Sequence, residues 1–150
     1  MSTINDIKAG IITRLNSSIS TYSQLSYQVD VARNKFKGNS KGFAVHPNSA
    51  TEVDSLIGAF TMDHSFAITL TNSYNNGASS QIGDTLKSSR ITEINDDILT
   101  AYKDLVNNKG SIDASILVIN DLSIDEAEFL DEEKVITIQF NINIKYKINK

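Results

Sequence analysis

The chain contains no cysteine and no tryptophan, and it has a single proline, Pro47. The absence of cysteine excludes disulfide bonds and every metal or catalytic site that depends on a thiolate. No apolar run approaches the roughly 18–20 residues that a membrane-spanning helix requires. Residues 1–16 also lack the basic start and continuous apolar core of a secretory signal peptide. We therefore expect the protein to be made and folded in a cytoplasm.

Basic residues are also in short supply, because 14 lysines and arginines face 18 aspartates and glutamates, for a net charge of −4. Nucleic-acid-binding domains are usually basic, so a general nucleic-acid binder is disfavoured. The apolar content of 40% and charged content of 21% are typical of a folded globular chain and not of a disordered one. At 150 residues, the chain is long enough to bury a substantial core, and we expect residues 1–150 to form a single domain.

The most regular feature is the segment from Val135 to Lys150, in which apolar and polar residues alternate. Successive side chains of a strand point to opposite faces, so this pattern predicts a half-buried β-strand. Fully extended, the segment spans about 46 Å, whereas a compact domain of this size is only about 40 Å across. We expect either a strong bend or a projection beyond the domain with pairing elsewhere, and we favour the projection.

The remaining periodicity predicts a helix with a buried face from Ile4 to Ile19 and a second helix over Asp84–Asn108. Further strands are expected over the following segments: Tyr27–Val31, Phe43–His46 (ended by Pro47), Phe60–Thr71 and Ile112–Asn120. Phe60–Thr71 repeats the alternation of the final strand, so we expect these two strands to pair. The predicted class is α+β: a mainly antiparallel sheet of about five strands flanked by two helices, with long projecting strands or loops.

The sequence carries little sign of catalysis. It contains no G-x-S-x-G, no P-loop and no G-x-G-x-x-G motif. His46 and His64 are the only histidines. His64 falls on the apolar face of a predicted strand, which favours a hydrogen-bonded core or interface histidine over a metal ligand. We expect no enzymatic activity, no catalytic residue, no metal site and no cofactor.

Two segments of opposite charge are candidate interaction sites. The basic segment carries Arg33, Lys35, Lys37 and Lys41. The acidic segment, residues 121–133, mixes carboxylates with bulky apolar side chains, and its candidate residues are Asp121, Asp125, Glu126, Glu128, Phe129 and Leu130. It is either a solvated hairpin loop or a docking arm, since a purely solvated loop has no need of bulky apolar groups.

In a head-to-tail ring, the basic segment of one subunit would meet the acidic segment of its neighbour. Contact with nucleic acid passing through the ring is the alternative use of the basic segment. The projecting end of the final strand adds Ile144, Tyr146 and Ile148 to the expected interface.

The order of elements and the segment GFAVHPNSATEVDSLIGAFTMDHSFAITLTNSY (residues 42–74) resemble the tail terminator and tail-completion proteins of tailed bacteriophages, the minor tail protein U type. The shared features are a leading amphipathic helix, a short strand ending at Val45-His46-Pro47, and a long strand closing in Leu-Thr-Asn. A later helix such as Ile91–Val106 and a long C-terminal strand complete the resemblance, which covers most of the chain.

The resemblance implies a structural virion protein of the phage neck, assembled in the host cytoplasm. Such proteins form a homo-oligomeric ring, commonly a hexamer, which ends the tail tube and joins it to the head. The implied partners are the tail tube protein and a neck or connector protein, with DNA passing but not specifically bound, and no membrane. The matching contact elements would be Arg33–Gly42, Asp121–Glu133 and the end of Ile136–Ile148. Another neck or connector protein and a monomeric acidic binding or adaptor module remain open as alternatives.

Overall fold

The computed structural model describes residues 3–24, 41–56, 58–73, 84–130 and 135–149. Its helices are α1 (Thr3–Ser18), α3 (Asp84–Asn107) and α4 (Lys109–Ile112). Its strands are β1 (Ser23–Gln24), β2 (Lys41–Leu56), β3 (Ala59–Ser73), β4 (Ile116–Ile124), β5 (Glu128–Leu130) and β6 (Val135–Asn149). The predicted α+β class with a mainly antiparallel sheet is confirmed. The described sheet has six strands, and β1 makes it mixed because it pairs with β2 in parallel.

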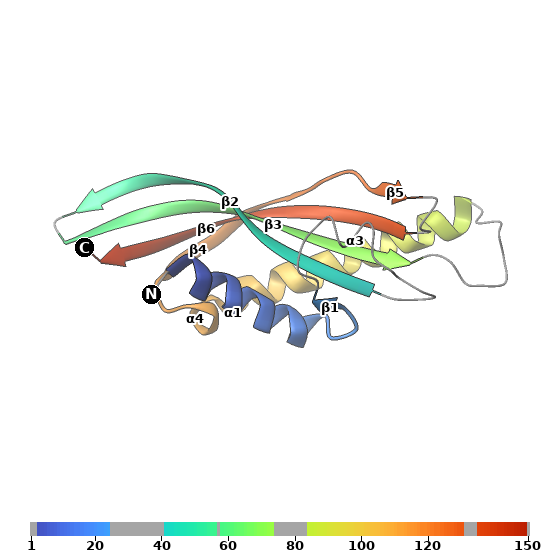
Figure 1. The fold of residues 1–150 in the computed structure, drawn as a ribbon, viewed down its shortest axis with the longest axis horizontal. Helices are drawn as coiled ribbons and strands as arrows, with labels where there is room; N and C mark the ends of the chain where they lie inside the picture. Colours follow the sequence, from blue (N-terminus) through green and yellow to red (C-terminus); the bar gives the residue numbers. More distant parts are fainter. Residues whose placement is uncertain (1–2, 25–40, 57, 74–83, 131–134, 150) are drawn as a thin grey trace.

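The strands lie in the order β1-β2-β3-β6-β4, and β5 also pairs with β6 (Figure 1). The two long alternating strands are partners, as predicted, and their register runs unbroken from Ala59↔Asn149 to Ser73↔Val135. On its other edge β6 pairs with β4 and β5. The prediction that the final strand pairs outside its own sheet is therefore wrong. β6 is a central strand with hydrogen-bonded neighbours on both edges, and all of these neighbours belong to the same chain.

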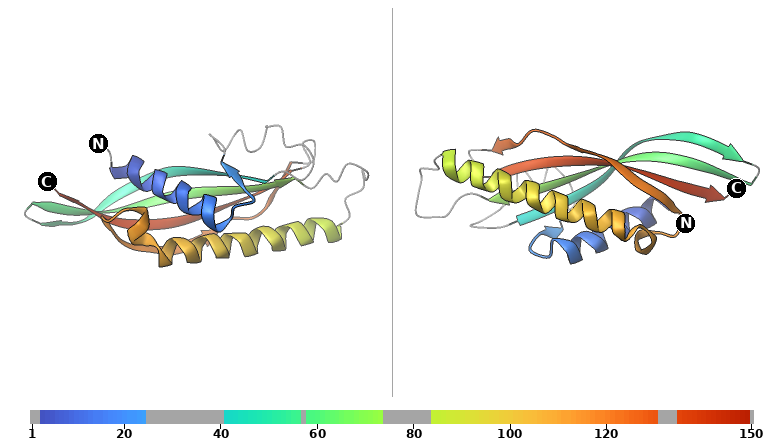
Figure 2. Two further views of the ribbon diagram at one scale, coloured as in Figure 1. Left: turned by 90° about the horizontal axis from the view of Figure 1, so that it is seen from below. Right: turned by 180° about the vertical axis from the view of Figure 1, so that it is seen from behind.

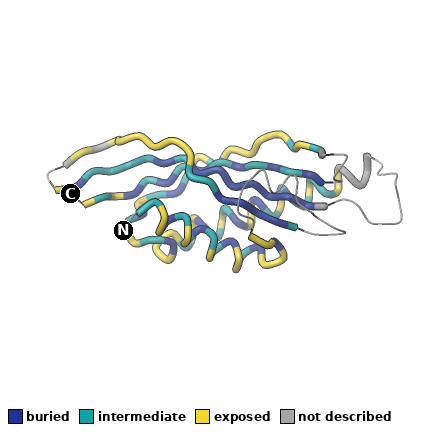
Figure 3. Tube along the Cα trace, viewed as in Figure 1, coloured by how far each residue is buried: buried dark blue, intermediate teal, exposed yellow. Residues whose placement is uncertain are grey.

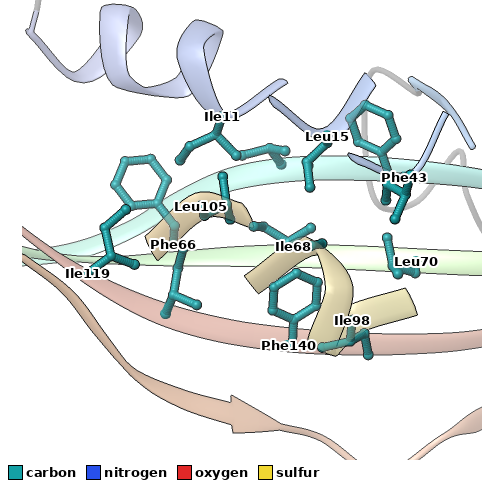
Figure 4. Close-up of a cluster of buried hydrophobic side chains, with 14 of the residues drawn as sticks. Ile11, Leu15, Phe43, Phe66, Ile68, Leu70, Ile98, Leu105, Ile119 and Phe140 are labelled. Carbon is teal, nitrogen blue, oxygen red and sulfur yellow. The ribbon is translucent and has the colours of Figure 1, made fainter. Parts of the chain in front are cut away.

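The apolar residues of the sheet face both long helices, which pack together on one side of it (Figure 2). α1 lies against β2, while α3 crosses β3, β6 and β4. Figure 4 shows side chains from all these elements meeting in one cluster, among them Ile11, Leu15, Phe43, Phe66, Ile68, Leu70, Ile98, Leu105, Ile119 and Phe140. The helical period of α1 and α3 and the two-residue period of the strands thus supply the two halves of one core.

Polar contacts also fasten α1 and the segment after it to α3. The Arg14 guanidinium binds the Asp104 carboxylate through two hydrogen bonds of 2.6 and 3.0 Å. The Tyr22 hydroxyl donates to Asp97 Oδ2 at 2.6 Å. Burial raises the pKa of Tyr22, and the hydrogen bond to Asp97 adds to the shift.

The ends of β2, β3 and β6 near the β2–β3 turn continue past the helices and form a projection (Figures 1 and 2). Gly58 makes this turn with φ +83°, a conformation that residues with a Cβ rarely adopt. A projection was expected. It consists of three paired strands and not of one free strand.

Pro47 does not end its strand, contrary to prediction. β2 continues to Leu56, with register shifts between Pro47 and Ala50 and between Glu52 and Asp54. Proline is tolerated at a sheet edge and at bulges. Within the described residues, β1 covers β2 only at Gly42 and Phe43, so Pro47 lies in an edge strand.

The region after α3 also differs from prediction. Helical structure does not end with the predicted helix at Asn108, because α4 follows α3 directly and includes Ile112. β4 therefore begins at Ile116 instead of Ile112 and extends to Ile124, into the acidic segment. The predicted strand Tyr27–Val31 lies outside the described residues.

Candidate interaction surfaces

The described part of the acidic segment, residues 121–130, is largely strand and is fastened to β6. The Asn143 amide donates to Asp121 Oδ2 at 3.2 Å, and the Asn141 amide donates to Asp125 Oδ1 at 3.3 Å. Asp121 has φ +58° at a register shift in β4. These bonds hold two carboxylates of the segment along the polar face of the sheet, so this part is not a free loop.

The second half of the segment combines exposed charge with an anchored aromatic ring. Glu126 and Glu128 are exposed, whereas Phe129 is partly buried against the core and its backbone pairs with Ile136. Leu130 pairs with Val135 at the end of β5. The bulky apolar residue Phe129 therefore serves the chain's own packing.

The basic segment is described only at its end, since Arg33, Lys35 and Lys37 lie outside the described residues. The Lys41 ammonium lies 2.6 Å from Glu93 Oε1 on α3 and 5.5 Å from the centre of the Tyr22 ring. The hydrogen bond from Lys41 lowers the pKa of Glu93. Lys41 is thus engaged within its own chain.

The predicted residues of the final strand differ in exposure. Ile144 and Tyr146 are buried in the chain's own core, so neither presents its side chain at the surface of this chain. Ile148, which lies opposite Phe60 in the projection, is only partly buried. The sequence pattern marks all three residues as apolar but does not show which of them the helices cover.

His64 is a core histidine, as predicted. Its ring is 7% exposed, with Nε2 3.1 Å from the Asn48 carbonyl and Nδ1 3.3 Å from the Tyr146 hydroxyl. Because a carbonyl only accepts, Nε2 donates to it, and Nδ1 of the neutral ring accepts from Tyr146. Burial lowers the pKa of His64. Asn48 lies within the register shift of β2, so this histidine ties the irregular part of β2 to the core.

Sequence reasoning missed a polar hollow of about 160 Å³ at that same register shift. Its lining residues come from three neighbouring strands: Ser49, Thr51, Asp63, Ser65 and Asn143. The alternation of β3 puts Asp63 and Ser65 on the polar face, but the hollow depends on the register between strands, for which the sequence carries no local signal.

The outer edges of the sheet form another surface that was not predicted. In the described chain β4 is one edge strand, and β2 is the other beyond its short pairing with β1; each carries at least one exposed large apolar side chain. Val53 on β2 is 49% exposed, and Leu117 and Ile124 on β4 are 49% and 39% exposed. Leu117 also lines an open hollow of about 450 Å³ with Asp113, Ala114, Ser115, Lys147 and Asn149.

In the described part of the chain, no helix is both long and apolar enough to cross a membrane. Among those same residues, no three His, Asp or Glu side chains gather closely enough to hold a metal ion. No family model matches the chain, and no curated protein matches it either.

Proposed function

We propose that this protein is a structural virion protein that forms a homo-oligomeric ring at the neck of a tailed phage, with six copies as the expected number. The ring ends the tail tube and joins it to the head. The resemblance to tail terminators supports the part of the proposal that concerns the phage neck. The observation that carries the ring is that β2 and β4, the long outer strands of the described sheet, expose large apolar side chains: Val53 on β2, and Leu117 and Ile124 on β4.

Strand direction favours a head-to-tail contact between these edges. Each of the pairs β2–β3, β3–β6 and β6–β4 is antiparallel, so β2 and β4 run in opposite directions. If β2 of one copy lies beside β4 of the next, the alternation continues and every copy turns the same face inward. Such a contact joins different surfaces of identical chains, and it gives a ring when the rotation closes.

The exposed apolar side chains of the two edges, Val53 and Leu117, lie at nearby heights. Register places Glu52, Met62, Tyr146 and Ile116 in one row across the sheet. Val53 lies in the register shift just beyond this row on the Lys147 side, and Leu117 lies in the register shift just beyond it on the Lys145 side, so the two are close in height on opposite edges. The hollow beside Leu117 gives the Val53 side chain of the next copy a place to enter.

The contact relies on side chains more than on a long backbone ladder. Both edge strands contain register shifts, two in β2 and two in β4, and bulges of this kind interrupt regular pairing. Figure 3 shows that the end of β2 in the projection is mostly exposed. Burial of Val53 and Leu117 against each other then supplies a hydrophobic contact that specifies the height of one copy on the next.

The test is to measure the mass of the full chain by light scattering over a range of concentrations, with electron microscopy of the largest species. The wild type is expected to form rings of one size. Val53→Glu and Leu117→Glu should each weaken assembly at least about tenfold, because an unpaired charge would be buried at the contact.

Leu99→Glu is the matched control, since Leu99 is 52% exposed but lies on α3 and not on either edge strand. It should assemble like the wild type, and all three variants should keep the wild-type circular dichroism spectrum. Assembly that is unchanged in Val53→Glu and Leu117→Glu would exclude the β2–β4 contact. A wild-type chain that stays monomeric, both alone and with purified tail ends, would count against the ring and favour the adaptor alternative.

A further inference from the structure

The hollow at the register shift of β2 combines one carboxylate with hydroxyl and amide groups. Asp63 and Ser65 approach it from β3, Ser49 and Thr51 from β2, and Asn143 from β6. The volume of about 160 Å³ is several times the roughly 30 Å³ that one water molecule occupies in the liquid. The hollow therefore has room for a polyatomic group as well as for water.

Asp63 forms no ion pair in the described chain. Its Oδ1 atom is buried without a hydrogen-bond partner among the described residues. The ion pairs of those residues are Arg14–Asp104, Lys41–Glu93 and Arg90–Glu93, and none of them includes Asp63. Lys145 lies opposite Asp63 in the register but forms no such pair with it. A partly buried carboxylate without compensation is costly, and a cation bound beside it would offset that cost.

We infer that this hollow binds the guanidinium group of an arginine side chain supplied by a partner protein. A guanidinium offers five N–H donors in one plane, and the hollow offers a carboxylate, three hydroxyls and an amide carbonyl, all of which accept hydrogen bonds. A lysine ammonium is more compact and would engage fewer of these groups. A Ca²⁺ ion takes 6–8 oxygen ligands, commonly with several carboxylates, whereas this hollow has one.

The rim of the hollow is held in place from the opposite face of the sheet. Ser49 directly follows Asn48, whose carbonyl accepts the 3.1 Å hydrogen bond from His64 Nε2. This bond restrains the irregular part of β2 before any ligand arrives. A site that is already ordered loses less conformational entropy on binding.

The experiment follows amide resonances of the ¹⁵N-labelled full chain during titration with the blocked tripeptide acetyl-Gly-Arg-Gly-amide. Saturable shifts are expected at the residues that line the hollow. The same peptide with citrulline has nearly the same shape without the charge, and it should bind at least about tenfold more weakly, because hydrogen bonds to charged groups are the stronger ones. The lysine peptide should also bind more weakly than the arginine peptide.

Asp63→Asn should weaken binding of the arginine peptide at least about tenfold. Asp96→Asn is the matched control, because Asp96 is an exposed carboxylate on α3 outside the hollow, and it should bind like the wild type. Equal affinity for the arginine and citrulline peptides, or for the arginine and lysine peptides, would overturn the inference. Saturation of the same resonances by Ca²⁺ alone would also overturn it. The peptide comparisons use the wild-type chain, so they do not depend on how Asp63→Asn folds.

Discussion

Among single residues, His64 links the irregular part of β2 to the core. Its ring packs against Phe66 with centroids 5.0 Å apart, and it lies beside the Tyr146 ring in a stacked arrangement at 6.2 Å. Both ring nitrogens have hydrogen-bond partners in the neutral form. Protonation adds a proton at Nδ1 and a charge inside the core. The neutral state is therefore part of the native packing, and this has a consequence for stability.

We predict that the free energy of unfolding falls as pH drops from about 7.5 to 5.5. Burial lowers the pKa of His64 below its ordinary value of about 6.5. The unfolded chain takes up this proton near pH 6.5, while the folded chain does so only at lower pH, so acid favours unfolding. The loss begins near pH 6.5 and grows until the folded pKa is reached. Urea unfolding at several pH values measures it.

His64→Gln keeps a donor for the Asn48 carbonyl and removes the titration, so its stability should depend less on pH in this window. His46 contributes in the same direction, because burial and then the charge of Lys8 lower its pKa. His46→Gln is therefore measured in the same way, so that the contributions of the two histidines to the pH dependence can be separated. If His64→Gln keeps the full wild-type pH dependence of stability, titration of His64 is not its cause.

At the scale of elements, α1 and α4 approach each other closely at Gly10. A Cβ at Gly10 would lie 2.4 Å from the Ile112 carbonyl oxygen and 2.9 Å from its Cα. We predict that Gly10→Ala lowers the free energy of unfolding by about 1–3 kcal/mol, the usual cost of overpacking. This cost exceeds the roughly 0.5–1 kcal/mol that alanine gains over glycine within a helix. Urea unfolding at neutral pH measures the difference.

Gly110→Ala is the control in α4 itself. No atom lies within 4 Å of a Cβ at this position, and its φ is not positive. The variant should be as stable as the wild type or gain about 0.4–1 kcal/mol. If Gly10→Ala and Gly110→Ala behave alike, the close approach of α1 and α4 is not a determinant of stability.

The sequence allowed some elements to be predicted and not others, for physical reasons. The alternation in β3 and β6 reflects one helix-covered face and one polar face, so it predicted both strands and their pairing. Pro47 was misread because its tolerance depends on lying at an edge, which is a property of the whole sheet. The turn of helix at Ile112 was missed because it is held by packing against Gly10, about a hundred residues earlier in the chain.

At the scale of the whole molecule, the proposed ring predicts an effect on assembly that a change within one chain would not produce. The double variant Val53→Glu with Leu117→Lys should assemble better than either Val53→Glu or Leu117→Lys alone. The two positions meet only between copies, where the opposite charges would pair. Light scattering at low and high salt measures the recovery, which should shrink as salt screens the pair. If the double variant assembles no better than the weaker single variant, Val53 and Leu117 do not contact each other between copies.

The candidate surfaces were the least predictable part of the molecule. Charge and apolar content drew attention to residues 121–133, yet Asp121 and Asp125 are hydrogen-bonded to β6. The hollow around Asp63 and the nearby heights of Val53 and Leu117 depend on register across several strands. Register is a non-local property, and the local pattern of a single sequence does not indicate it.

The central position of β6 also sets the order in which the fold can be completed. β3 and β4 lie on opposite sides of β6 and do not pair with each other in the described sheet. During synthesis, at about 5–20 residues per second, β2 and β3 leave the ribosome well before their missing neighbour exists. Until β6 is synthesised, the β2–β3 hairpin therefore has an unpaired edge on β3 and an incompletely covered apolar face. The nascent chain passes through a period in which chaperone binding or premature association competes with the arrival of its own last strand.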